Sequence, residues 1–302
     1  MSNLSIKINN LELKNPTILA SGVLGVTAAS LDNVVRNGAG AVVTKSISRE
    51  ARKGHPAPII TTYEAGMLNA VGYSNPGAVK AREEFCNLNI DAPVILSIIG
   101  QEPSDFQEVY NQLKDCKWQA IEVPLSCPHT PGYGTMGGQH TPKMAEKIVK
   151  ALKEVTNLPL WIKLSPNENL VAVGKAAESA GADALVAGNT MGPGMIIDIE
   201  TYKPILGFGM GGVSGATLKP IALRCVYDLY KSVRIPIIGC GGVSTGQDMI
   251  AMMMAGARAV GVGTAVLDRS VNVFKMINKE AKAWLTEHDF KKIEDIIGLA
   301  HK

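Results

Sequence analysis

A hydroxyl, a thiol and an imidazole follow a strand-like apolar run near the middle of the chain. The run 120–125 leads into Ser126, Cys127 and His129, and a glycine-rich segment follows at 131–138. A cysteine thiol ordinarily has a pKa of about 8.5, so Cys127 could act as a base once its pKa is lowered or at alkaline pH. His129 could assist or be a surface histidine. Free cysteines are often small buried hydrophobes, but the break in the run favours a site.

Two lysines end strand-like segments elsewhere. Lys45 follows the apolar run 41–44, and Lys163 lies within the run 160–164. A buried ammonium is costly without a partner or ligand. Lys163 could form a Schiff base, as in an aldolase, or place a fixed positive charge beside a cofactor. It could also reach solvent, and Lys45 has the same ambiguity.

Amide side chains and glycine-rich segments are further candidates for ligand binding. Asn69, in a long connection, and Asn189 could each bind a planar ligand with carbonyl and N–H edges, or simply hold a loop together. The glycine-rich segments 239–244 and 261–264 favour a phosphate site, because glycines let backbone N–H groups approach an anion. Residues 211–215 could add another wall. The alternative is that these glycines only allow tight turns.

Short apolar runs alternate with helical patterns along most of the chain. Such alternation predicts a parallel (β/α)8, or TIM, barrel, with a doubly wound sheet as the alternative. Glycine in Ala-Gly-Ala triplets should end several helices. The predicted strands are 17–20, 41–44, 93–98, 120–125, 160–164, 184–187, 236–239 and 259–262, and the predicted helices are 28–36, 78–86, 104–114, 142–155, 170–180, 218–232, 246–255 and 271–288.

Three further segments should flank this barrel. Residues 6–8 and 11–13 alternate around a turn and predict a hairpin covering the bottom of the barrel. Two long connections, 46–77 and about 190–217, should lie on the carboxyl face, where barrel active sites are built. Within the second, 195–199 and 204–208 are possible short strands. We expect one domain spanning residues 1–302.

Composition limits the function classes. The 302 residues are 46% hydrophobic with a net charge of +3, too small an excess to predict nucleic-acid binding. We expect no signal peptide and no membrane span. The five cysteines have no metal-binding spacing, so we expect no metal and a reduced, cytoplasmic location. Cys86, Cys116, Cys225 and Cys240 are interpreted as structural.

Taken together, these residues resemble the class 1 dihydroorotate dehydrogenases, flavin barrels of pyrimidine biosynthesis. The likeness covers nearly the whole chain and is greatest to the catalytic subunit of the two-subunit, NAD-linked type (class 1B) in its archaeal form. The motifs that carry it are Asn15-Pro16, Ala20-Ser21-Gly22, Thr44-Lys45-Ser46, Arg52-Lys53-Gly54, residues 66–72, Leu125-Ser126-Cys127-Pro128, residues 163–167, Gly188-Asn189-Thr190, residues 211–215 and residues 219–223.

The resemblance implies FMN across the barrel mouth and dihydroorotate between the flavin and the loop. Lys163 would stabilise the anionic reduced flavin rather than form a Schiff base. Cys127 would remove a proton from C5 while C6 delivers a hydride to flavin N5. Implied cofactor contacts are Ser21, Lys45, Ser46, Lys163, Gly188, Gly215, Gly241, Gly242, Gly263 and Thr264; implied substrate contacts are Lys45, Asn69, Ala70, Val71, Gly72, Tyr73, Asn189 and Thr190.

Two positions depart from the family pattern. Pro124 stands where the family has an asparagine that contacts flavin and substrate, so part of the usual recognition is missing or supplied elsewhere. His129 stands where many members have asparagine. The resemblance also implies a separate FAD and iron–sulfur subunit that passes electrons to NAD, and a homodimer; direct use of fumarate or another acceptor is the alternative.

Three other functions are compatible with the sequence. A dihydropyrimidine dehydrogenase-like flavoenzyme would act on uracil or dihydrouracil. A phosphate-binding aldolase would use Lys163, and a non-catalytic flavin-binding subunit would hold FMN that no dihydropyrimidine reduces.

Overall fold

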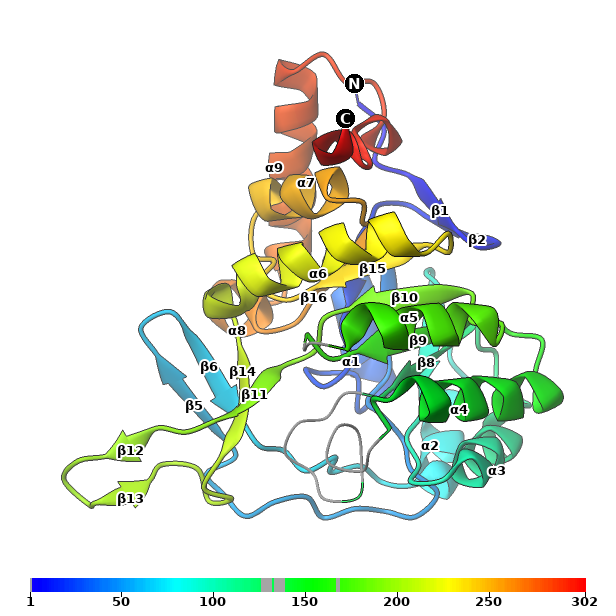
Figure 1. The fold of residues 1–302 in the computed structure, drawn as a ribbon, viewed down its shortest axis with the longest axis vertical. Coiled ribbons are helices and arrows are strands. Elements are labelled where there is room, and N and C mark those ends of the chain that lie inside the picture. The colour runs from blue at the N-terminus through cyan, green and yellow to red at the C-terminus, as the bar shows by residue number, and fades with distance from the viewer. Residues whose placement is uncertain (1, 126–131, 133–138, 167–168) are drawn as a thin grey trace.

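Eight parallel strands close into a barrel, as predicted (Figure 1). A computed structural model describes residues 2–125, 132, 139–166 and 169–302. Around the barrel the strands are ordered β10-β15-β16-β3-β4-β7-β8-β9. Their bounds are β3 (Thr17–Leu19), β4 (Ala41–Val43), β7 (Val94–Ser97), β8 (Ala120–Pro124), β9 (Leu160–Leu164), β10 (Ala184–Ala187), β15 (Ile237–Cys240) and β16 (Ala259–Val262).

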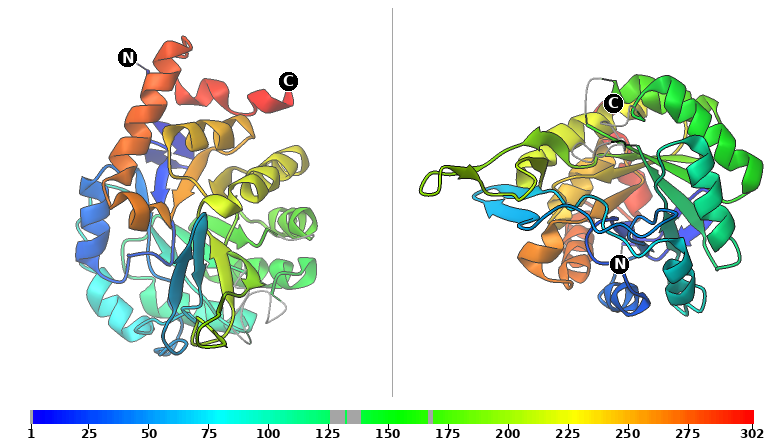
Figure 2. Two further views of the ribbon diagram at one scale, coloured as in Figure 1. Left: turned by 90° about the vertical axis from the view of Figure 1, so that its left-hand side faces the viewer. Right: turned by 90° about the horizontal axis from the view of Figure 1, so that it is seen from below.

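Helices surround the barrel and bury their apolar faces against it (Figures 1 and 2). Two of the Ala-Gly-Ala glycines, Gly181 (+104°) and Gly256 (+114°), follow helix ends with positive φ, as predicted, and Gly38 (+97°), just before a third such triplet, does the same. The helices are α1 (Ala28–Arg36), α2 (Ala78–Phe85), α3 (Pro103–Leu113), α4 (Pro142–Val155), α5 (Leu170–Ser179), α6 (Lys219–Ser232), α7 (Gly246–Met254), α8 (Ala265–Arg269) and α9 (Val273–Glu287), with short 3-10 turns η1 (Ala216–Leu218), η2 (Ile293–Ile296) and η3 (Leu299–His301).

The predicted amino-terminal hairpin is confirmed. Strands β1 (Ile6–Ile8) and β2 (Leu11–Leu13) pair antiparallel. Asn9, at the turn, donates from Nδ2 to the Asp183 carbonyl at 2.8 Å and accepts from the Trp161 indole at 3.1 Å. Because Asp183 precedes β10 and Trp161 lies at the start of β9, these bonds hold the hairpin at the amino ends of the strands, opposite the carboxyl face.

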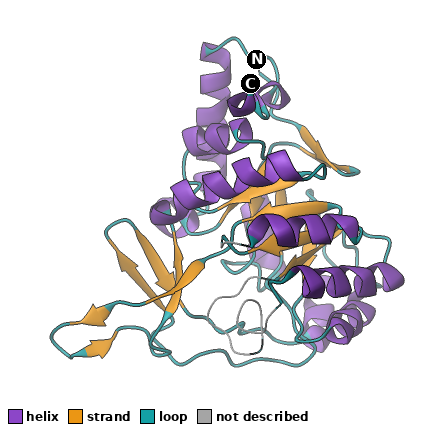
Figure 3. Ribbon diagram, in the orientation of Figure 1, coloured by secondary structure: helices purple, strands orange, loops and turns teal. Residues whose placement is uncertain are grey.

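A second sheet stands on the carboxyl face and was predicted only in part. It joins β5 (Ile60–Tyr63) and β6 (Gly66–Asn69) from the first long connection to β11 (Met191–Gly194) and β14 (Gly211–Ser214) from the second, in the order β11-β14-β6-β5. The expected strands at 195–199 and 204–208 are shorter, as β12 (Ile197–Asp198) and β13 (Lys203–Pro204), in a projecting arm (Figure 3).

Two cysteines correct the expectation of reduced thiols. Cys86, just after α2, and Cys116, just after α3, form a disulfide with a Cα–Cα distance of 4.3 Å. They are separated by 30 residues in sequence and meet because α2 packs beside α3. Sequence spacing alone gives no indication of this contact. Cys225 and Cys240 are free and buried, which fits the interpretation of Cys225 as structural.

Neither a membrane span nor a metal cluster is found in the part of the chain that the structure describes. No described helix is both long and apolar enough to cross a membrane. The described ranges likewise bring no three His, Cys, Asp or Glu side chains together in a metal-binding group.

Candidate active site

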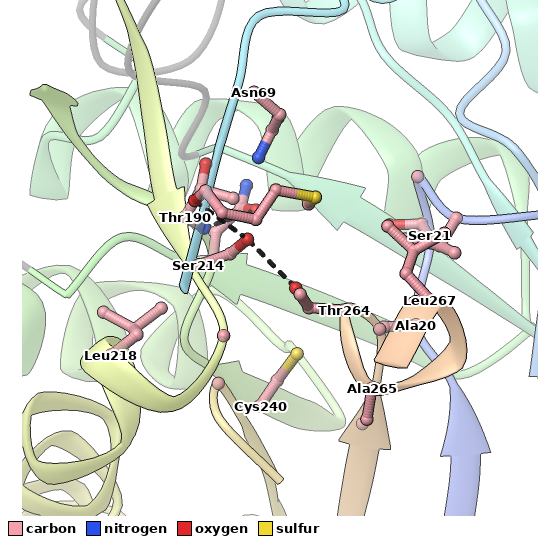
Figure 4. A pocket seen from close by; sticks show the side chains of 18 of the residues that line it. Ala20, Ser21, Asn69, Thr190, Ser214, Leu218, Cys240, Thr264, Ala265 and Leu267 are labelled. Atoms are coloured by element: carbon pink, nitrogen blue, oxygen red, sulfur yellow. Dashed lines mark hydrogen bonds between the residues drawn. The ribbon is translucent and has the colours of Figure 1, made fainter. Parts of the chain in front are cut away.

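A cavity of about 400 Å³ lies between the carboxyl ends of the barrel strands and the second sheet. Its volume suits a small organic ligand or cofactor. Residues far apart in the sequence meet in its wall: Ala20 and Ser21 follow β3, Cys240 ends β15, and Asn69 comes from β6. Figure 4 shows these side chains around the pocket, with Ser21 on one side and Leu218 on the other.

A buried ion pair lies at the barrel side of this pocket. Lys163 is 3% exposed, and its Nζ atom lies 3.8 Å from Oε1 of Glu122, which is 2% exposed. The Ser21 hydroxyl bridges the two groups: it donates to Glu122 Oε1 at 2.6 Å and accepts from Lys163 Nζ at 3.1 Å. Lys163 therefore brings a cation to the pocket wall that is already oriented by partners inside the protein.

Two further serines extend this network across the barrel. Ser97 lies at the end of β7, and its hydroxyl donates to Glu122 Oε1 at 3.3 Å. The oxygens of the Ser97 and Ser46 hydroxyls are hydrogen-bonded at 2.9 Å. The Ser97 backbone N–H donates to the Thr44 hydroxyl at 3.0 Å. Buried polar groups that satisfy one another in this way hold a single arrangement. The network joins strands β3, β4, β7, β8 and β9 just below the pocket.

The opposite wall comes from the second sheet. Thr264, which follows β16, donates to the Ser214 hydroxyl at 2.9 Å, and this bond links the barrel to β14 (Figure 4). Asn69 lines the pocket and donates from Nδ2 to the Gly212 carbonyl at 3.2 Å. Because this bond fixes the orientation of the amide, the side-chain oxygen of Asn69 is the acceptor that it can offer a ligand.

The pocket glycines that follow β15 and β16 have different structural reasons. Gly241 and Gly242 have positive φ, and an added Cβ would come within 2.8 Å of the Ala222 side chain or 2.6 Å of Lys219, so packing against α6 explains them. At Gly263, by contrast, φ is ordinary and an added Cβ would meet no atom nearer than 3.9 Å. Neither packing nor backbone strain requires glycine at 263, and a side chain there would enter the cavity.

Most predicted site residues meet in this one pocket, although their roles stay predictions. Cys127 and His129 lie outside the described residues. The predicted cofactor contacts in the wall are Ser21, Lys45, Ser46, Lys163, Gly215, Gly241, Gly242, Gly263 and Thr264, and the predicted substrate contacts are Lys45, Asn69, Val71, Gly72, Tyr73, Asn189 and Thr190.

Two predicted contacts are absent from the pocket wall, and packing accounts for both. Gly188 has φ +120°, and an added Cβ would lie 1.8 Å from the Cys240 carbonyl oxygen, so close strand packing requires its glycine. Ala70 is buried in a small core with Leu68 and Leu206 beneath the second sheet.

Sequence reasoning missed Glu122 as part of the site and interpreted Cys240, which lies in the predicted phosphate segment 239–244, as structural. Cys240 lines the pocket, and burial raises the pKa of its thiol, so it is held in the neutral form. The signal for Glu122 was a carboxylate inside an otherwise apolar strand, since such a residue needs a partner. Ser214 lies in the segment 211–215 predicted as a further wall, but its bond to Thr264 has no signal in the sequence.

His140 anchors the segment that precedes α4 and carries a pH-dependent prediction. It is 6% exposed, and its Nε2 accepts from the Ser165 backbone N–H at 3.0 Å. Burial lowers the pKa of His140 to about 4. In the unfolded chain the pKa is about 6.5, so as pH falls the unfolded state takes up the proton first and stability is lost between about pH 6.5 and 4. The loss from this group is about 3 kcal/mol.

This loss is measured by urea unfolding at a series of pH values. His140→Gln, which cannot titrate, should have a shallower decline in unfolding free energy than wild type over that range. The exposed His288, replaced by Gln, is the control and should keep the wild-type decline. Equal slopes for wild type and His140→Gln would contradict the assignment.

Comparison with known proteins identifies the family of this chain. The family model described as dihydroorotate dehydrogenase matches residues 3–285. The chain belongs to the dihydroorotate dehydrogenase family. It is 49% identical to the dihydroorotate dehydrogenase B (NAD(+)) catalytic subunit of Methanosarcina mazei, with 100% of this chain and 96% of the relative covered. The Pyrococcus horikoshii protein of the same name is 45% identical, with 99% and 98% covered.

A solved dihydroorotate dehydrogenase has the same fold. The crystal structure of DHODH in complex with ferulenol from Eimeria tenella superposes with a TM-score of 0.82 at 22% identity, covering 99% of this chain and 89% of that chain. At this identity the likeness concerns the barrel architecture alone. Family membership does not support the aldolase alternative for Lys163.

Dihydroorotate dehydrogenases are FMN enzymes, and the residues present fit FMN. The cavity has room for a cofactor, and the open space at Gly263 is where a side chain would obstruct one. Gly215, Gly263 and Thr264 bring backbone to the same part of the wall, as a phosphate group requires. The buried Lys163 would bring positive charge to a cofactor bound in this pocket.

Proposed function

We propose that the protein oxidises (S)-dihydroorotate to orotate in the biosynthesis of UMP, with FMN as cofactor. The observation that carries this proposal is the pocket at the carboxyl ends of the strands, in which an oriented lysine faces the side chains of the second sheet in a member of the dihydroorotate dehydrogenase family. FMN, when bound, supplies the hydride acceptor that no amino-acid side chain can provide.

The side chains of the chain itself would bind, orient and deprotonate the substrate. Lys45, Asn69, Val71–Tyr73 and Asn189-Thr190 line the pocket and offer the charges and amide edges that a pyrimidine carboxylate needs. Cys127 would remove the proton from C5. Lys163 would stabilise negative charge that develops next to it, because its ammonium is fixed before the reaction begins.

Pro124 alters the pocket next to Lys163. It ends β8 in register with Lys163 and lines the pocket, where its ring presents no donor or acceptor. Substrate recognition therefore depends on Asn69 and Asn189 more than it would with an amide at position 124.

We further infer an assembly from the names of the relatives. They are catalytic subunits of an NAD(+)-dependent enzyme, which implies a partner subunit. That partner would carry FAD and an iron–sulfur cluster and pass electrons to NAD, with fumarate as the alternative acceptor. We infer a homodimer of the catalytic chain, each copy one domain of residues 1–302, and a cytoplasmic location.

Anaerobic titration of the FMN-loaded protein tests the function. Dihydroorotate should bleach the flavin absorbance, and dihydrouracil at equal concentration should not. Bleaching by dihydrouracil alone would instead indicate a dihydropyrimidine dehydrogenase-like enzyme. Bound FMN that neither compound reduces would indicate a non-catalytic flavin-binding subunit.

A further inference from the structure

Glu122 is a buried carboxylate that the proposed function does not use. It lies in β8 between apolar neighbours, is 2% exposed and does not form part of the pocket wall. Taking a carboxylate out of water costs several kcal/mol, which its partners in the protein must offset. Two of its partners, Ser21 and Lys163, line the pocket, so its effect on the pocket is exerted through them.

Three groups converge on one oxygen of this carboxylate. Glu122 Oε1 accepts from the Ser21 hydroxyl at 2.6 Å and from the Ser97 hydroxyl at 3.3 Å, and lies 3.8 Å from Lys163 Nζ. Of these, Ser21 and Lys163 line the pocket, whereas Glu122 and Ser97 lie behind them. The carboxylate thus contacts the pocket only through the side chains it binds.

The bond to Glu122 determines what Ser21 can offer a ligand. A hydroxyl has one proton and two lone pairs. Because Ser21 gives its proton to Glu122 and accepts from Lys163 at 3.1 Å, it presents an acceptor, rather than a donor, to the pocket. Lys163 in turn commits one of its three N–H groups to Ser21, and this fixes the direction of its ammonium.

The same carboxylate determines the net charge beside the pocket. Glu122 and Lys163 together are neutral, and at a separation of 3.8 Å the carboxylate offsets much of the ammonium potential. Removal of the negative charge alone would leave a buried cation in the wall. An anionic ligand form would then bind more tightly relative to a neutral one.

We propose that Glu122 is a positioning residue that orients Ser21 and Lys163 and sets the charge that FMN meets at the pocket wall. The inference rests on the proposed FMN site, and it concerns how this chain adjusts the relative affinity for oxidised and reduced cofactor. Glu122 acts through Lys163 and Ser21 and is not itself a catalytic residue.

The test compares the dissociation constants of oxidised and reduced FMN for wild type and Glu122→Gln. Glutamine keeps the size and an acceptor oxygen but removes the charge. We expect the ratio of the two constants to shift about tenfold in favour of reduced FMN, which equals about 30 mV for a two-electron couple. Ser97→Ala, which removes a donor to the same oxygen without altering formal charge, is the matched control and should shift the ratio by less than about threefold.

A second variant tests the positioning role separately. Glu122→Asp keeps the charge but withdraws the carboxylate by one methylene, so it should weaken binding of both forms of FMN several-fold with little change in their ratio. An unchanged ratio in Glu122→Gln, or a shift toward oxidised FMN, would overturn the charge role. If Glu122→Asp binds oxidised and reduced FMN with the affinities of wild type, the positioning role is overturned. This outcome does not depend on whether Glu122→Gln folds.

Chemical reduction with dithionite keeps this test independent of substrate. If wild type binds FMN and Glu122→Gln shifts the ratio but dihydroorotate does not bleach the flavin, the substrate assignment fails and the inference about Glu122 stands. If dihydroorotate bleaches wild type but the ratio of the two FMN dissociation constants is unchanged in Glu122→Gln, the substrate assignment stands and the inference about Glu122 fails. A protein that binds no FMN would overturn both.

Discussion

Replacing Cys127 by alanine is expected to slow dihydroorotate-dependent flavin reduction by about 10²- to 10⁴-fold, the usual contribution of a general base. Alanine has no proton acceptor, and the described residues of the pocket that would hold FMN are unchanged in this variant. The variant should therefore retain FMN, with an absorbance spectrum like that of wild type. Anaerobic stopped-flow measurement of flavin bleaching gives the rate.

Cys225→Ala is the matched control for this experiment. Cys225 is a free thiol buried on α6, away from the pocket wall, and burial raises its pKa to about 11. Its replacement should leave the rate of bleaching within about twofold of wild type, because no proton transfer depends on it. A Cys127→Ala variant that reduces its flavin at the wild-type rate would exclude Cys127 as the base.

Replacing Lys163 by methionine is expected to have the largest effect on the folded protein itself. Methionine fills a similar volume but leaves Glu122 buried without its cation, and loss of one partner of a buried pair costs about 3–5 kcal/mol. Reduced FMN should also bind more weakly relative to oxidised FMN, opposite to the shift for Glu122→Gln. Urea unfolding of the apoprotein and the two FMN dissociation constants measure these effects.

Two control variants show whether the stability loss comes from the buried Lys163–Glu122 pair. Lys153 pairs with Asp183 at 2.6 Å near the surface, with about a third of each side chain exposed, so Lys153→Met should cost about 1 kcal/mol or less. The double variant Lys163→Met/Glu122→Gln should recover part of the lost stability, because no unpaired buried charge remains. A Lys163→Met protein as stable as Lys153→Met would show that the buried pair contributes no coupling.

The barrel and much of its site could be predicted from local sequence. Strands β9, β10 and β16 and helices α1 and α4 have the predicted bounds, because their apolar spacing and end residues are short-range properties that one segment contains by itself. The carboxyl ends of parallel strands meet at one mouth. Lys45, Lys163 and the glycines after β15 and β16 could therefore be assigned to one pocket before any contact was known.

The tertiary structure alone decided the features that depend on two distant segments. β6 and β14 are short, contain glycine and lack strong periodicity, so they are strands because they pair with each other and with β5 and β11. Two further features depend on residues that are distant in sequence. Gly188 is glycine because its backbone lies against the Cys240 carbonyl, and the disulfide joins Cys86 to Cys116.

Glu122 shows the same division at the site. The sequence indicates the enzyme family, the residues at the strand ends and the presence of a carboxylate within an apolar strand. It did not determine the partner of that carboxylate, since Ser21 lies 101 residues away and Lys163 on the adjacent strand. Closure of the barrel brings the three side chains together. This contact is what allows Glu122 to be buried, because a buried charge is tolerated only where the fold supplies its hydrogen bonds and its counter-charge.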